Sequence, residues 1–125
     1  MTVEKWSAAA ITTLASTELN SLASAAGALG VEYDNATNDY PFGMFELTVT
    51  FGSAPTAGKT VDLYLIPATD GTNYSTTVTG ASGYAQSTSY VGSFPLQAVT
   101  TLQRLNLGGI GARGTLFLPP TKFKA

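Results

Sequence analysis

Apolar and polar residues alternate along most of the chain after Val31, in short runs separated by turn-forming residues. Side chains of a strand point alternately to its two faces, so this period of two indicates strands that are buried on one side. Asp, Asn, Gly and Pro residues between the runs indicate turns. The predicted strands lie in five stretches: PFGMFELTVTF (41–51), KTVDLYLIP (59–67), SYVGSFPLQAV (89–99), QRLNLGGI (103–110) and LFLPPTKFKA (116–125).

Short strands at this spacing predict an all-β fold, namely a jelly-roll-like antiparallel β-sandwich. The alternation also predicts which side chains face the core. In 41–51 these are Phe42, either Met44 or Phe45, Leu47, Val49 and Phe51. In 59–67 one face carries Val61, Leu63 and Leu65, and the other carries Asp62, Tyr64 and Ile66.

The N-terminal stretch has a different pattern, because its apolar residues recur at helical spacings and it is rich in Ala. Ser16 is a candidate N-cap, Glu18 falls in the first turn, and Gly27 is a candidate end. We therefore predict a short helix here. Residues 1–15 are expected to form an arm and residues 16–125 the β-sandwich domain.

Composition narrows the possible functions. Charged residues make up only 11% of the chain, against about 25% in a typical soluble domain. The net charge of −2 offers no basic surface for nucleic acid or an anionic membrane. The N-terminus lacks the basic flank and apolar core of a signal peptide, which favours synthesis in the cytoplasm. A surface so poor in charge suits a protein that neighbouring subunits cover.

Two glycine-rich stretches resemble nucleotide-binding motifs but fail on context. In GSAPTAGKT (52–60), Gly52 stands one place too early for a P-loop, and a β-branched strand pattern follows where a helix is required. GIGARG (109–114) matches the dinucleotide fingerprint in letters only, because Pro119-Pro120 prevents the helix that must follow. Both stretches are interpreted as turns, the first as a hairpin connection.

No catalytic constellation emerges. The chain has no Cys and no His, which removes thiolate chemistry and the usual general base. Glu46 and Asp62 lie on neighbouring predicted strands and could face one surface as a carboxylate pair, but alternation favours solvent-facing positions. We expect no enzymatic activity, no cofactor and no metal site.

Aromatic residues are the best candidates for binding. Tyr74, Tyr84 and Tyr90 fall in or near the long uncharged stretch GTNYSTTVTGASGYAQSTSY (71–90), and long ordered loops are usually functional. Tyr is enriched where proteins contact one another. We expect a protein contact there, with a glycan contact as the alternative. Trp6 in the arm and Arg113 in GIGARG are further candidate contacts.

The order of these segments resembles small virion proteins of tailed bacteriophages. The resemblance extends from about Thr13 to Ala125, and its most specific part is the run from Ala54 to Tyr74, with VDLYLIPATDGTNY at its centre. It implies a β-sandwich that coats or joins the particle, such as a head decoration (cement) protein bound to the major capsid protein, expected as a homotrimer. A tail-fibre, spike or neck adaptor component, with glycan or receptor binding, is the alternative.

The resemblance also raises a question about the last strand. Such proteins tend to continue after a segment like LPPTKFKA with a further strand and turn, whereas this sequence ends at Ala125. Either the last strand is short, or a neighbouring subunit completes its sheet. An uncovered edge strand would serve as a pairing template for such a neighbour.

Overall fold

The computed structural model describes residues 11–24, 26–74, 90–107 and 116–125, and most of its regular secondary structure is antiparallel β-sheet. In these residues helix is limited to η1 (Thr17–Leu19) and α1 (Asn35–Asn38). The strands are β1 (Tyr33–Asp34), β2 (Phe42–Gly43), β3 (Phe45–Val49), β4 (Thr60–Tyr64), β5 (Ile66–Pro67), β6 (Tyr90–Pro95), β7 (Gln103–Leu107), β8 (Leu116–Phe117) and β9 (Lys122–Lys124). The all-β class predicted from alternation is confirmed.

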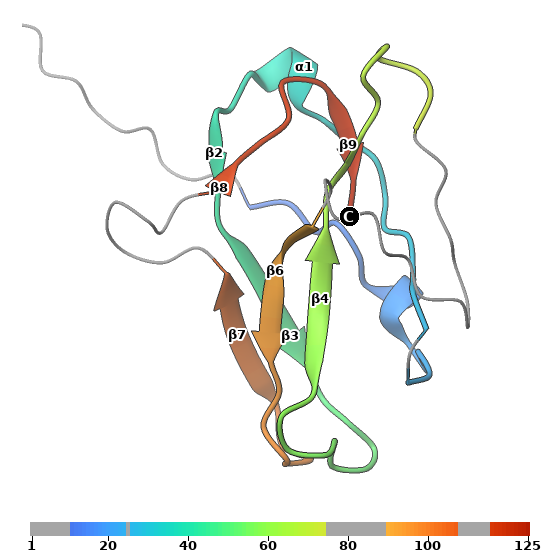
Figure 1. Ribbon diagram of the computed structural model, residues 1–125, viewed down its shortest axis with the longest axis vertical. Helices are drawn as coiled ribbons and strands as arrows, with labels where there is room; N and C mark the ends of the chain where they lie inside the picture. The colour runs from blue at the N-terminus through green and yellow to red at the C-terminus, as the bar shows by residue number, and fades with distance from the viewer. Residues whose placement is uncertain (1–10, 25, 75–89, 108–115) are drawn as a thin grey trace, which may run out of the picture.

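The strands pair in a nested order. β1 pairs with β9, β2 with β8, β3 with β7 and β4 with β6, and every pair is antiparallel. β5 joins the free edge of β9, so that β1, β9 and β5 form a three-stranded sheet. Figure 1 shows the long strands β3, β4, β6 and β7 in the lower half of the molecule, with β2, β8, β9 and α1 above them. Early and late segments of the chain therefore lie together throughout the fold.

Alternation along β3 builds one half of the core. Leu47 is buried, Phe45 and Val49 are half-buried, and Leu47 lies opposite Leu105 of β7. The predicted inward face is confirmed for Phe45, Leu47 and Val49, and of the two alternatives Met44 and Phe45 it is Phe45 that faces inward. The prediction was wrong for Phe42 on β2, which is 40% exposed. Met44 is 65% exposed.

The pair β4–β6 supplies the facing half. Phe94 is buried and Val61 lies opposite it. A Cβ atom placed on Gly92 would lie 3.2 Å from Cδ2 of Leu107, so β6 approaches the inner face of β7 closely at this glycine. The apolar faces of β3–β7 and β4–β6 thus meet at Gly92.

The predicted strand KTVDLYLIP is divided in two. β4 ends at Tyr64, and β5 begins at Ile66 on a different sheet. Leu65 and Ile66 are both buried, which strict alternation within one strand does not allow. Ile66 was predicted on the face opposite Leu65, and this was wrong because the chain changes sheets between them.

The last predicted strand is also two strands. Pro119 and Pro120 separate β8, which pairs with β2, from β9, which pairs with β1 and β5. Phe123 of β9 is only 2% exposed, and its ring centroid lies 5.3 Å from that of Tyr33. β9 is short and has a partner on both edges, so no neighbouring subunit is needed to complete its sheet.

The predicted N-terminal helix is reduced to one turn of 3-10 helix. Asn20 adopts an extended conformation and Ser21 has a positive φ of 59°, so the helix does not continue toward Gly27. The Ser16 side chain forms no cap; instead the Glu18 carboxylate accepts a hydrogen bond of 2.8 Å from the Ser16 amide. Helices of this length are marginal in water without tertiary packing, and Leu22 stays 40% exposed.

The N-terminal segment is tied to the rest of the fold before residue 16. The Val31 amide donates a hydrogen bond of 2.7 Å to the carbonyl of Leu14, and the Gly30 amide donates one of 2.7 Å to the carbonyl of Ala125. In the described part of the predicted arm, residues 11–15, Leu14 is therefore bound to the rest of the fold. Ile11 in the same segment is 97% exposed.

The connection that resembles a P-loop joins two different strand pairs. Residues 50–59 run from β3 to β4, which pair with β7 and β6 and not with each other, so the predicted hairpin was wrong. Gly58 has a φ of 82°, which favours glycine, and β4 begins directly at Thr60. The phosphate-binding helix that a P-loop requires is replaced by a strand, as the sequence predicted.

Candidate interaction surface

The sequence proposed five contact residues, and the structure describes two of them. Trp6, Tyr84 and Arg113 lie outside the described residues. Tyr74 and Tyr90 stand at the two ends of segment 75–89, which is itself outside the description. Each of the two tyrosines belongs to a polar network of its own.

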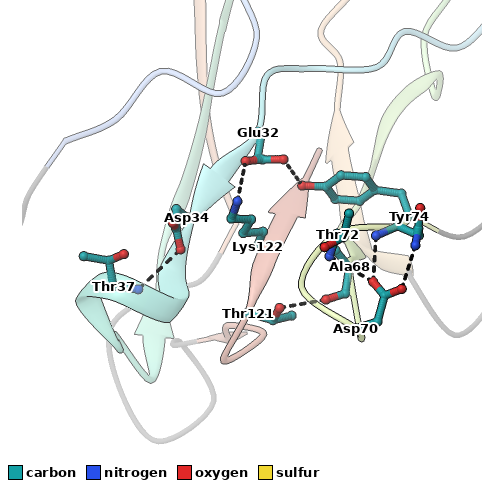
Figure 2. A network of polar contacts seen from close by, with 10 residues as sticks. Glu32, Asp34, Thr37, Ala68, Asp70, Thr72, Tyr74, Thr121 and Lys122 are labelled. Atoms are coloured by element: carbon teal, nitrogen blue, oxygen red, sulfur yellow. Dashed lines mark hydrogen bonds and ion pairs between the residues drawn. The ribbon is translucent and has the colours of Figure 1, made fainter.

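Tyr74 is held against the C-terminal strand (Figure 2). Its hydroxyl donates a hydrogen bond of 2.5 Å to Oε2 of Glu32, and Oε1 of the same carboxylate lies 3.5 Å from Nζ of Lys122. Nζ of Lys124 lies 4.8 Å from the centroid of the Tyr74 ring. The side chain that was predicted to contact a partner is therefore half-buried and already engaged within the chain, so its role is to anchor residue 74 to β9.

The same contacts fix the protonation of this network. Burial raises the pKa of Tyr74 to about 12, and the hydrogen bond to Glu32 acts in the same direction. The hydrogen bond from Tyr74 lowers the pKa of the Glu32 carboxyl, and the charge of Lys122 lowers it further. The phenol therefore keeps its proton and the carboxylate stays ionised at neutral pH.

A tight turn positions Tyr74. The Asp70 carboxylate accepts hydrogen bonds from the Thr72 amide at 2.9 Å, the Asn73 amide at 2.6 Å and the Asn73 side chain at 2.8 Å. The backbone bond from Asn73 is the main cause that lowers the pKa of Asp70 to about 2. Gly71 adopts a φ of 79° within the turn, which favours glycine at this position.

Tyr90 stands on the outer face of β4 and β6 and is 47% exposed. Its ring meets that of Tyr64 edge to face, with centroids 5.5 Å apart. Its hydroxyl lies 2.7 Å from Oγ of Ser93, and Ser93 donates a hydrogen bond of 2.6 Å to Oδ1 of Asp62. The Thr60 hydroxyl donates to the same oxygen at 2.9 Å. We call these residues, Thr60, Asp62, Tyr64, Tyr90 and Ser93, the tyrosine–aspartate row.

An irregularity in strand pairing creates the row. Leu63 lies opposite Gly92, but the next residue, Tyr64, lies opposite Tyr90, so Val91 is an extra residue on β6. Without this bulge, Tyr90 and Ser93 would point to opposite faces, because they are three positions apart on the strand. Sequence alternation marks the tyrosine as exposed but gives no signal for the bulge, and the row was therefore missed.

A second exposed feature is apolar. Tyr40, Phe42 and Met44 occupy alternate positions where the chain leads through β2 into β3, and they are 39%, 40% and 65% exposed. Gly43 between them faces inward, since a Cβ atom there would lie 2.9 Å from Cδ2 of Leu118. We call Tyr40, Phe42 and Met44 the apolar stripe. Sequence reasoning placed Phe42 in the core and so did not find it.

Glu46 and Asp62, which the sequence allowed as a carboxylate pair but favoured as solvent-facing residues, are on separate strand pairs. Glu46 is on β3, where it accepts a salt bridge from Arg104 of β7 at 3.6 Å, while Asp62 is on β4 in a separate strand pair. Within the described residues no group of three His, Cys, Asp or Glu side chains is placed to hold a metal ion. No helix in the same part of the chain is long and apolar enough to span a membrane.

Comparison of the chain with protein-family models, curated proteins and solved structures finds no match. Function is therefore inferred from the residues and their geometry. The two exposed features are the surfaces available for that inference, because the Tyr74 network is satisfied within the chain.

Proposed function

We propose that this chain is a structural protein of a tailed-bacteriophage virion, a head decoration protein that binds the major capsid protein and has no enzymatic activity. It is made in the host bacterial cytoplasm and resides in the virion, as a homotrimer. The resemblance of its segments to small virion proteins supports this class. The nested strand pairing supports a jelly-roll-like sandwich, an architecture that recurs in viral capsid proteins, although a fold alone does not determine a function.

The apolar stripe is the observation that carries the attachment function. The side chains of Tyr40, Phe42 and Met44 stand at alternate positions of one segment and are all exposed, with Met44 65% exposed. Contiguous exposed apolar surface of this kind marks sites of contact with other proteins. Met is well suited to such a contact because its flexible thioether adapts to irregular partner surfaces. The low charge of the chain, 11% of residues, is consistent with a surface that neighbours cover.

The proposed mechanism is linkage between binding and assembly. A protein that binds only the assembled lattice stabilises that lattice by mass action, with a free energy that grows with its concentration over its dissociation constant. Burying one Met side chain contributes about 1.5–3 kcal/mol. Part of the gross gain from the stripe is offset by the loss of side-chain and rigid-body freedom on binding.

Two charge substitutions test this proposal. Met44→Glu introduces a charge into the stripe, and we expect it to weaken binding to purified particles at least about tenfold. Leu102→Glu is the matched control, because Leu102 is 62% exposed but precedes β7, away from the stripe. Co-sedimentation with particles depleted of the wild-type chain measures both. Equal binding of Met44→Glu and wild type would remove the stripe from the account.

The alternative is a tail-fibre, spike or neck component that binds a glycan or a receptor. The exposed ring of Tyr90 is the observation that favours it, because sugar rings stack on exposed aromatic side chains. The two locations differ in stoichiometry: a head decoration protein is present in copies of the same order as the major capsid protein, and a tail or neck component at a small fraction of that number.

A further inference from the structure

We propose that the tyrosine–aspartate row is a binding site for an arginine side chain of the partner protein, with the guanidinium group between the Asp62 carboxylate and the Tyr90 ring. This inference rests on the proposed function, because it assigns partner chemistry to one attachment surface. It is independent of the apolar stripe, which lies on other strands.

The hydroxyls of Thr60, Tyr90 and Ser93 have no proton to offer a ligand. Ser93 donates its single hydroxyl proton to Asp62, so in the 2.7 Å contact between Tyr90 and Ser93 the phenol must be the donor. Thr60 donates its proton to Asp62 as well. These three hydroxyl protons are therefore used within the chain, two of them on Oδ1 of Asp62, and the outward lone pairs of the three oxygens can only accept.

Among the described residues, Asp62 also has no counter-charge. In the described part of the chain, the salt bridges join Arg104 to Glu46 and Lys122 to Glu32, and neither involves Asp62. Oδ1 of Asp62 accepts both printed hydrogen bonds, which leaves Oδ2 with no partner among the described residues. A carboxylate whose second oxygen is open, on an exposed strand face, is complementary to a cation with several donors.

The tyrosine pair favours a planar cation. The edge-to-face arrangement of Tyr64 and Tyr90, with an angle of 63° between the rings, fixes the Tyr90 ring while leaving the residue 47% exposed. A guanidinium group stacks on aromatic faces and carries five donors and no acceptor. A lysine ammonium would satisfy the charge but would not stack as a plane. A sugar hydroxyl both donates and accepts, and the hydroxyls of Thr60, Tyr90 and Ser93 have no proton left for it.

The site is built before it binds. Asp62 and Ser93 lie directly opposite each other in the β4–β6 ladder, and the bulge at Val91 brings Tyr90 to the same face. The hydrogen-bonded hydroxyls hold the carboxylate in one orientation, so little side-chain freedom is lost when a guanidinium arrives. This preorganisation distinguishes Asp62 from Glu46, whose exposed carboxylate already has Arg104 beside it.

The experiment titrates the whole chain with a short peptide that carries two arginines, and follows the backbone amides of β4 and β6 by NMR. The matched peptide carries citrulline, which keeps the planar shape but has no charge. We expect shifts centred on Asp62 and Tyr90, with affinity about fivefold weaker for the citrulline peptide and falling with added salt. Equal affinity for both peptides would overturn the proposal.

Variants localise the effect to the row. Asp62→Asn keeps the shape and removes the charge, and we expect it to weaken arginine-peptide binding about fivefold. Tyr90→Leu should weaken it by about threefold, and Tyr90→Phe, which keeps the ring, should restore most of that loss. Glu46→Gln is the control on the other strand pair and should leave affinity unchanged. An equal loss with Glu46→Gln would show non-specific attraction and overturn the proposal.

Two further outcomes separate this inference from the proposed function. If methyl glycosides shift the same amides and the arginine peptide does not, the site is a sugar subsite and the arginine assignment is wrong. If the arginine peptide binds as expected but the wild-type chain does not attach to particles, the decoration function fails and the site stands. If Asp62→Asn loses peptide binding but still attaches to particles, the contact with the particle lies elsewhere. That result would refute the assignment of the row to the partner protein.

Discussion

The Asn35 side chain offers the sharpest test of how the fold is held together. It is fully buried at the start of α1. Its amide group donates to the carbonyls of Tyr40 and Pro119, each at 2.8 Å, and its oxygen accepts from the Tyr40 amide at 3.0 Å. One side chain thus joins the turn after β1 to the Pro119-Pro120 segment that separates β8 from β9.

Replacing this residue should be costly. Asn35→Ala removes three hydrogen bonds at about 1 kcal/mol net each, so we expect the free energy of unfolding to fall by about 3 kcal/mol. With a urea m-value of about 2 kcal/mol/M, the midpoint should move down by about 1.5 M. Urea unfolding followed by circular dichroism measures this shift. Asn106→Ala, on the exposed side of β7, is the control and should stay within about 0.5 kcal/mol of wild type.

A second variant tests whether the stability that Asn35 contributes depends on the donor and acceptor positions of its side chain, and not only on its volume. Asn35→Asp keeps the shape but replaces the buried NH2 donor with a carboxylate oxygen that faces the carbonyl oxygens of Tyr40 and Pro119, which should raise the folded-state pKa of the new carboxyl above its unfolded value of about 3.9. The loss in free energy of unfolding of Asn35→Asp relative to wild type should be smallest below about pH 3.9. This loss should grow as the pH rises through the raised pKa of the folded state. If Asn35→Ala proved as stable as Asn106→Ala, the proposed contribution of the three hydrogen bonds would be refuted. The same would hold if the stability of Asn35→Asp relative to wild type did not depend on pH.

Three further predictions concern the core, a backbone contact and acid stability. Phe123→Ala should lower the free energy of unfolding by about 3–5 kcal/mol, because the ring is 2% exposed; urea unfolding measures it, and a loss under about 1 kcal/mol would contradict its place in the core. Gly30→Ala should lower the free energy of unfolding by about 1–3 kcal/mol, because the new Cβ would clash with the Leu14 carbonyl oxygen. The control, Gly52→Ala, meets nothing within 4 Å and should be close to neutral. Urea unfolding measures both variants, and equal effects would argue against the close approach of Gly30 to Leu14. The Asp70 carboxyl should titrate by NMR near pH 2, below the 3.8 of an unperturbed Asp carboxyl, so its contribution to stability is complete above pH 3.8 and is lost as pH falls toward 2. A midpoint near 3.8 would contradict the turn geometry.

Alternation in the sequence predicts most of the strands but not where they change partners. Phe45, Leu47 and Val49 follow the period of two, and the structure confirms their inward face. The alternation cannot show that the chain leaves β4 at Leu65 to join another sheet, because burial on both sides of that step depends on β9, which is distant in sequence. Pro119-Pro120 was interpreted as the start of one strand, although two residues without a backbone N–H are better suited to separate two.

The N-terminal helix was overestimated because helical spacing of apolar residues is not sufficient. A short amphipathic helix is stabilised mainly when its apolar face packs on a core, and the 40% exposure of Leu22 shows that no such packing occurs at that residue. Ser21 in the left-handed region ends any continuation after η1.

Of the candidate site, the sequence singled out Tyr74 and Tyr90 but did not predict what they contact within the chain. Tyr74 and Tyr90 look equivalent as aromatic residues in polar surroundings. Only the structure shows that Glu32, from a segment distant in sequence, engages the first, and that the extra residue Val91 presents the second beside Asp62. Single-sequence patterns do not contain such long-range pairings, since they depend on the register of strands far apart in the chain.

Quantitative mass spectrometry of purified virions from the source of this gene tests the central claim most directly. The account predicts that the chain is present in copies of the same order as the major capsid protein, as expected for a protein that decorates the head. Absence of the chain from purified particles would contradict the claim outright, and a copy number at a small fraction of the capsid protein would contradict the head assignment in favour of a tail or neck component.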